Sequence, residues 1–105
     1  LADVILMRAE AAFRLGNTAQ ALTDVNAIRV RSGVPALTTI TEADILAERG
    51  RELAWEGWRR NDLIRFGKFS TARKFMSVTD KTRELFPIPQ PRRDANPLLT
   101  QNPGY

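Results

Sequence analysis

The segment from residue 45 to residue 67 constrains the fold most, because charged and apolar side chains both recur along it with helical spacing. On a helix of about 3.6 residues per turn, four of its charged residues fall within one narrow stripe, and an apolar seam lies about a quarter-turn away. The stripe comprises Ile45, Arg49, Glu52, Glu56, Arg59 and Leu63, and the seam comprises Leu46, Leu53, Gly57 and Ile64. The segment therefore predicts helix with a ladder of alternating charges beside a buried face.

The charge ladder has two interpretations. In the first it is a solvated face, where each ion pair contributes only about 0.2–0.5 kcal/mol. In the second it is a buried ion network that fixes how the helix sits on its neighbours. We expect the second, because the ladder lies beside the apolar seam and a proline-rich tail needs a surface to cover. At least two of its four members should be buried and paired with each other, with backbone of another segment, or with both: Arg49, Glu52, Glu56 and Arg59.

Two helices are expected before this segment. The first covers residues 3–15, with Asp3 as its N-cap and Gly16 at its end. The second runs from Asn17 or Thr18 to about Arg31. Small and large residues alternate with the spacing of a tetratricopeptide-type helical hairpin of about 34 residues. The alternative is an ordinary antiparallel pair of helices. The residues with the tetratricopeptide-type spacing are Ala9, Ala12, Gly16, Ala21, Val25 and Ile28.

The rest of the chain divides into helix, loop and tail. Thr41 and the acidic residues after it predict the start of a third helix. Gly57 marks a bend or a close-packing point, and a fourth helix should run from Arg59 to about Phe66. Residues 68–84 read as a loop with at most one helical turn. Five of the six prolines lie between Pro87 and Pro103, which predicts a tail without helix or central strand. Its expected anchors on the helical body are Phe86, Ile88 and Leu98 or Leu99.

The expected fold is therefore all-α: a tetratricopeptide-like helical hairpin, two further helices and an extended proline-rich C-terminal tail. We expect a single domain over residues 1–105, with a helical body at about 3–67, a loop at 68–84 and the tail at 85–105.

Composition excludes several classes of function. The chain has neither Cys nor His, which removes thiol chemistry, disulfides and the commonest general base and metal ligand. The net charge is +4, but 16 basic residues are interleaved with 12 acidic ones, so nucleic-acid binding is not expected. No apolar run approaches the roughly 20 residues of a membrane span.

Three ordered motifs resemble the C-terminal signature of the SusD/RagB family of nutrient-uptake outer-membrane lipoproteins. The first comprises Glu48-Arg49, Glu52-Leu53, Trp55-Glu56-Gly57, Arg59, Asp62-Leu63, Arg65 and Gly67. The other two lie in the tail, at residues 85–90 and at residues 94–97 with 101–105. The resemblance extends from about Asp3 to Tyr105, and Leu98 departs from it, where a polar residue is expected.

The resemblance implies a parent protein without enzymatic activity or cofactor, located on the extracellular face of the outer membrane. It would capture a glycan and pass it to a SusC-like TonB-dependent transporter. Family members carry an N-terminal signal and a lipid anchor, so we expect this chain to be a segment and membrane association to depend on that anchor. The segment itself should supply scaffold, with the glycan site mostly elsewhere.

Three groups of residues were considered as sites. Glu48, Glu52 and Glu56 form a row on one helix flank, each near an Arg, which favours ion pairs over acid–base catalysis. Asp94 and Asn96 could bind Ca²⁺, but an Asx-turn before Pro97 explains them better. Trp55 and Trp58 are candidates for stacking on a sugar, and packing against neighbouring helices or the tail is the favoured alternative.

Two other functions were weighed. A free-standing tetratricopeptide-like protein-interaction module should show at least three repeats, whereas this chain has one hairpin followed by non-repeating sequence. A basic RNA-binding helical domain would need clustered Lys and Arg with exposed aromatic residues.

Overall fold

The structure is a computed structural model that describes residues 1–105. It contains five α-helices, one short 3-10 helix and no strand, so the all-α fold is confirmed. The chain forms two compact units, Leu1–Asp62 and Leu63–Tyr105, which are described separately. The expectation of a single domain stays a prediction. The helices are α1 (Ala2–Arg14), α2 (Thr18–Arg31), α3 (Glu42–Glu52), α4 (Arg59–Arg65) and α5 (Gln90–Ala95), with η1 at Lys81–Glu84.

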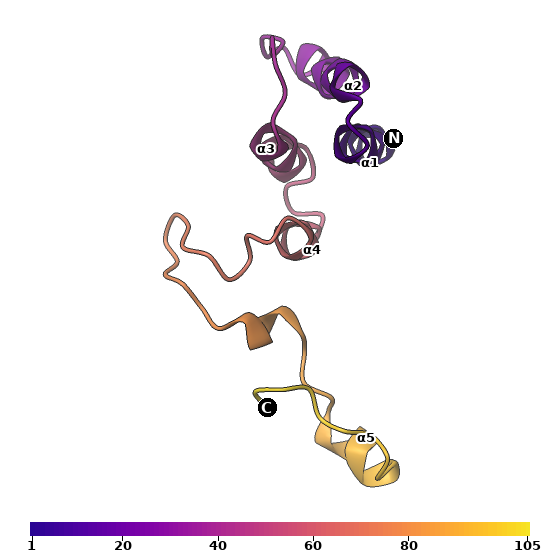
Figure 1. Ribbon diagram of the computed structural model, residues 1–105, viewed down its shortest axis with the longest axis vertical. Coiled ribbons are helices and arrows are strands. Elements are labelled where there is room, and N and C mark those ends of the chain that lie inside the picture. The colour runs from indigo at the N-terminus through magenta and orange to yellow at the C-terminus, as the bar shows by residue number, and fades with distance from the viewer. The chain divides into compact units, whose positions relative to one another are not determined.

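In the first unit, α1 packs against both α2 and α3 (Figure 1). Aliphatic side chains form the apolar part of the core between these helices, and burying them provides the main favourable free energy of folding. Helices α1 and α2 form the expected hairpin, while its tetratricopeptide character stays a prediction. The buried apolar residues of this unit are Leu6, Ala9, Ala21, Val25, Ile28, Ile45 and Leu53.

Local signals set the ends of the first helices. Gly16 has a φ of 82°, and its amide donates to the Phe13 carbonyl over 2.9 Å while the Asn17 amide donates to the Ala12 carbonyl over 2.8 Å. This Schellman arrangement ends α1 where the sequence predicted. The Asn17 side chain accepts from the Gln20 amide at the start of α2. The expected N-cap role of Asp3 is wrong: Leu1 occupies the N-cap, and the Asp3 carboxylate faces Arg49 instead.

The third helix is shorter than the charge stripe predicts. It begins at the Thr41–Asp44 capping box and ends at Glu52. Trp55 and Gly57 then adopt φ values of 68° and 80°, in the left-handed region that a right-handed helix cannot contain. The segment is therefore two helices joined by a turn, and the stripe does not continue from Glu52 to Glu56 on one helix.

A side-chain amide fixes the connection between α2 and α3. Asn26 Nδ2 donates to the Leu37 carbonyl over 2.9 Å, and the Leu37 amide donates to Asn26 Oδ1 over 2.7 Å. We call this reciprocal pair an amide clamp. One side chain thereby satisfies both polar groups of a loop residue that has no strand or helix partner.

The second unit corrects the expectation for the tail. Residues Gln90–Ala95 form α5, with Pro91 in its first turn, where a missing N–H and a fixed φ are tolerated. The expected single helical turn in the loop is η1. Within the second unit Phe86 and Leu98 are 70% and 89% exposed and Leu99 is 37% exposed, and docking of the tail on the helical body stays a prediction. A second amide clamp fixes the tail: the Ile88 amide donates to Gln101 Oε1 over 2.8 Å, and Gln101 Nε2 donates to the Ile88 carbonyl over 3.0 Å.

Candidate functional site

The turn between α3 and α4, residues 53–58, is held on both sides by buried charge. Arg49 in α3 and Asp62 in α4 are 2% and 1% exposed in their side chains, and Arg49 Nε donates to Asp62 Oδ2 over 3.0 Å. Arg49 Nη2 also lies 3.0 Å from Asp3 Oδ1 of α1. A buried ion pair of this kind fixes geometry more reliably than it adds stability. One guanidinium thereby connects three helices.

The four expected members of the network occupy different environments. Arg49 is buried, but its partners are Asp3 and Asp62 and not the other three members. Glu52 is partly exposed and accepts from Arg31 of α2 over 2.6 Å. Glu56 lies exposed in the turn because α3 has already ended. The ion network is therefore built across helices instead of along one stripe.

Arg59 provides a second connection across the turn. Its Nη1 donates to the Leu46 carbonyl over 2.8 Å, so its guanidinium lies over α3. A Cβ at Gly50 would lie 2.7 Å from that Nη1, which is closer than real Cβ atoms approach. Gly50 thus makes room for Arg59. The signal of this close approach in the sequence is a glycine inside a charged helix.

Trp55 stands at the apex of the turn with its whole side chain in solvent, at 104% relative exposure. Its φ of 68° is rare for a bulky residue. Trp58, three residues later, is 40% exposed. The expected packing of these indoles against neighbouring helices does not describe Trp55 in this structure. Ligand binding by Trp55 and Trp58 stays a prediction.

Two glutamates of the row, Glu48 and Glu52, form ion pairs as expected, whereas no ion pair is seen for Glu56 in the turn. Glu48 is buried and accepts from Arg29 of α2 over 3.0 Å and from Arg51. Glu52 pairs with Arg31. Paired carboxylates in glycoside hydrolysis flank a substrate, whereas these lie side by side on one helix and face basic residues. The arrangement positions helices and places no free acid opposite a base.

A carboxylate with a lowered pKa lies in the hairpin. Asp24 is buried, and Arg8 holds it through two hydrogen bonds, from Nε over 2.9 Å and from Nη2 over 2.7 Å. Gln20 donates a third, over 2.9 Å. The hydrogen bonds from Arg8 are the main reason that the pKa of Asp24 lies below its ordinary value, and they raise the pKa of Arg8. This bidentate ion pair, which we call the Arg8–Asp24 fork, joins α1 to α2.

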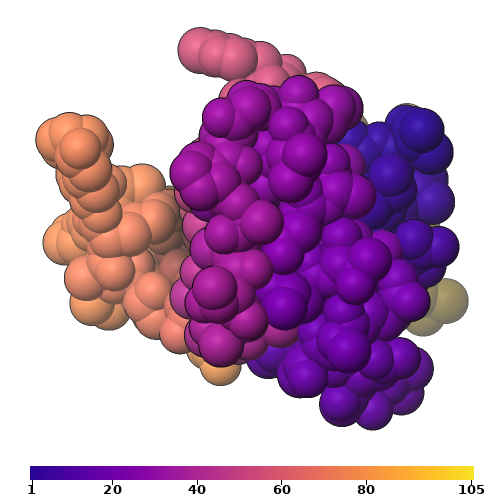
Figure 2. Space-filling view, turned by 90° about the horizontal axis from the view of Figure 1, so that it is seen from above, coloured from indigo at the N-terminus to yellow at the C-terminus, as the bar shows by residue number.

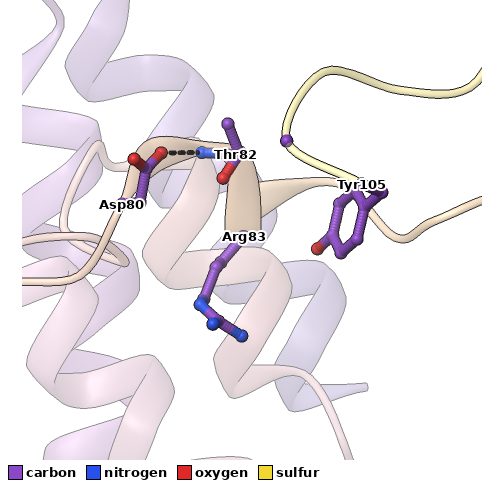
Figure 3. A pocket seen from close by; sticks show the side chains of 5 residues that line it. Asp80, Thr82, Arg83 and Tyr105 are labelled. Carbon is purple, nitrogen blue, oxygen red and sulfur yellow. Dashed lines mark hydrogen bonds between the residues drawn. The ribbon is translucent and has the colours of Figure 1, made fainter.

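The second unit contains an open cavity of about 390 Å³ between η1 and the end of the tail (Figure 3). The Thr82 amide donates to Asp80 Oδ1 over 2.8 Å and so lowers the pKa of Asp80. Gly104 approaches the Thr82 side chain so closely that a Cβ there would lie 2.8 Å from it. The Tyr105 hydroxyl donates to the Leu85 carbonyl over 3.0 Å. Several of the lining groups thus hold the tail in place.

The other site hypotheses were also compared with the structure. Asn96 forms the expected Asx-turn, since its Oδ1 accepts from the Leu98 amide over 3.1 Å. Asp94 accepts from Gln90 in α5. No cluster of three or more acidic side chains is arranged to hold a metal ion. None of the helices combines the length and the apolar character that a membrane-spanning segment requires.

The whole chain is similar to proteins of one family. The family model described as "SusD family" matches residues 1–105. The starch-binding protein SusD of Bacteroides thetaiotaomicron is 37% identical over 100% of this chain and 20% of its own length. The crystal structure of a SusD-like protein from Bacteroides fragilis aligns with a TM-score of 0.86 at 26% identity, over 99% of this chain and 25% of that one.

A further similar structure contains a ligand. Surface glycan-binding protein A from Bacteroides thetaiotaomicron, in complex with laminarihexaose, aligns with a TM-score of 0.78 at 30% identity. The alignment covers 96% of this chain and 23% of that protein. This chain therefore spans between a fifth and a quarter of the length of these relatives.

Proposed function

This chain belongs to the SusD family, and on that basis we propose that it is the C-terminal scaffold segment of an outer-membrane lipoprotein that captures glycans. The complete protein would pass the glycan to a SusC-like TonB-dependent transporter. It would lie on the extracellular face of the outer membrane, held by an N-terminal lipid anchor. The work is capture and hand-off, without a catalysed reaction.

The observation that supports this proposal most directly is similarity to glycan-binding proteins along essentially the whole chain. One relative is named a starch-binding protein, and another was solved with laminarihexaose. The two are 37% and 30% identical to this chain. Starch and laminarihexaose are both built of glucopyranose, so the proposed ligand class is a glucan or a related glycan.

The contacts inside the first unit support the scaffold role. Arg49 ties α3 to Asp3 of α1 and Asp62 of α4, and Glu48 and Glu52 tie α3 to α2. A binding protein that hands over its ligand needs a rigid frame to present its contacts. A free-standing interaction module is less well supported, because the α1–α2 hairpin is followed by helices of a different arrangement.

The test uses the full-length gene product, purified from outer membranes under mild detergent. Native gel electrophoresis with amylopectin or laminarin in the gel measures capture, and mass spectrometry of the purified complex identifies bound transporters. We expect retardation by at least one polysaccharide and recovery of a TonB-dependent transporter. Unchanged mobility in both polysaccharides and in other glycans of a panel contradicts capture, and a complex without such a transporter contradicts hand-off.

A further inference from the structure

We draw no further inference here: the strongest candidate, the exposed apolar face of α1 formed by Val4, Met7 and Ala11 (α1 is indigo in Figure 2), belongs to a chain that spans about a fifth of the length of its relatives, and nothing in the structure shows what covers it.

Discussion

Arg49 and Asp62 form a buried ion pair, 3.0 Å from Nε to Oδ2, directly across the turn that exposes Trp55. The two residues are 13 positions apart, on different helices, and together they close the base of this turn. The most buried charges of the first unit and its most exposed aromatic side chain thus belong to one local structure.

Removal of this ion pair should be costly. Asp62→Asn leaves the buried Arg49 guanidinium without the more buried of its two carboxylate partners, and we expect the free energy of unfolding to fall by about 3–5 kcal/mol. Glu56→Gln is the matched control, since the exposed carboxylate should change stability by less than about 0.5 kcal/mol. Urea denaturation measures both. Equal midpoints for the two variants would show that the buried pair does not position the helices.

The apolar contribution of the turn is tested at Leu53. This side chain is buried where α3 ends, so Leu53→Ala should lower the free energy of unfolding by about 2–5 kcal/mol. Leu98→Ala removes the same atoms from a side chain that is exposed and should have little effect. A denaturation midpoint that Leu53→Ala leaves unchanged would show that the apolar seam does not stabilise the fold.

The Arg8–Asp24 fork should make stability depend on acid pH. Because the folded pKa of Asp24 lies below its unfolded value, the fork contributes its full stability above the unfolded pKa of about 3.9. This contribution is lost as the pH falls through the folded pKa. We expect a decline in the denaturation midpoint below about pH 4 that is shallower in Asp24→Asn. Parallel pH profiles for the two proteins, measured between acidic and neutral pH, would contradict the assignment.

Because the backbone at Trp55 is left-handed, glycine at position 55 and glycine at position 54 should change the free energy of unfolding in opposite directions. Trp55→Gly should stabilise the protein by about 0.5–1 kcal/mol, because the strain removed exceeds the entropy that glycine adds to the unfolded chain. Ala54→Gly next to it adds the same entropy without relieving strain and should destabilise by about 0.5–1 kcal/mol. Thermal melts of the two variants measure the difference. A destabilised Trp55→Gly would show that the indole makes stabilising contacts.

The amide clamp of the tail can be tested at a single backbone group. Gln101→Ala removes both hydrogen bonds to Ile88, so the Ile88 amide should lose its protection against hydrogen exchange. Gln90→Ala removes an exposed amide of the same type, which bonds only Asp94 and Arg93 within α5, and should leave Ile88 protected. Unchanged exchange at Ile88 in Gln101→Ala would show that other contacts hold the tail.

The sequence was most informative where a few adjacent residues determine the backbone. The capping box at Thr41, the cap at Asn17 and the glycine at position 16 set the helix ends near the predicted positions. The prediction of one charged stripe over residues 45–67 was wrong beyond Glu52. The spacing of side chains does not indicate where a residue such as Trp55 adopts a left-handed φ. Proline content likewise overestimated the irregularity of the tail, since Pro91 falls in a first helical turn.

The candidate site was only partly visible in the sequence. Arg49 was selected correctly as a buried charge, but its partners lie on α1 and α4 and could not be found from one helix. Arg59 binds a backbone carbonyl of another helix across Gly50, which the prediction allowed, but its side chain is exposed. The exposure of Trp55 depends on where α3 ends, which the helical spacing does not indicate.

The two amide clamps bear on how far related chains can vary in length. Each clamp fixes a loop through one side chain, Asn26 or Gln101, and needs no regular pairing in the residues between its ends. Doubling the length of a flexible loop costs only about 0.6 kcal/mol in closure entropy, less than two hydrogen bonds contribute. Insertions at residues 32–36 or 96–100 should therefore be tolerated, and loops of different lengths can be displayed on an unchanged helical frame.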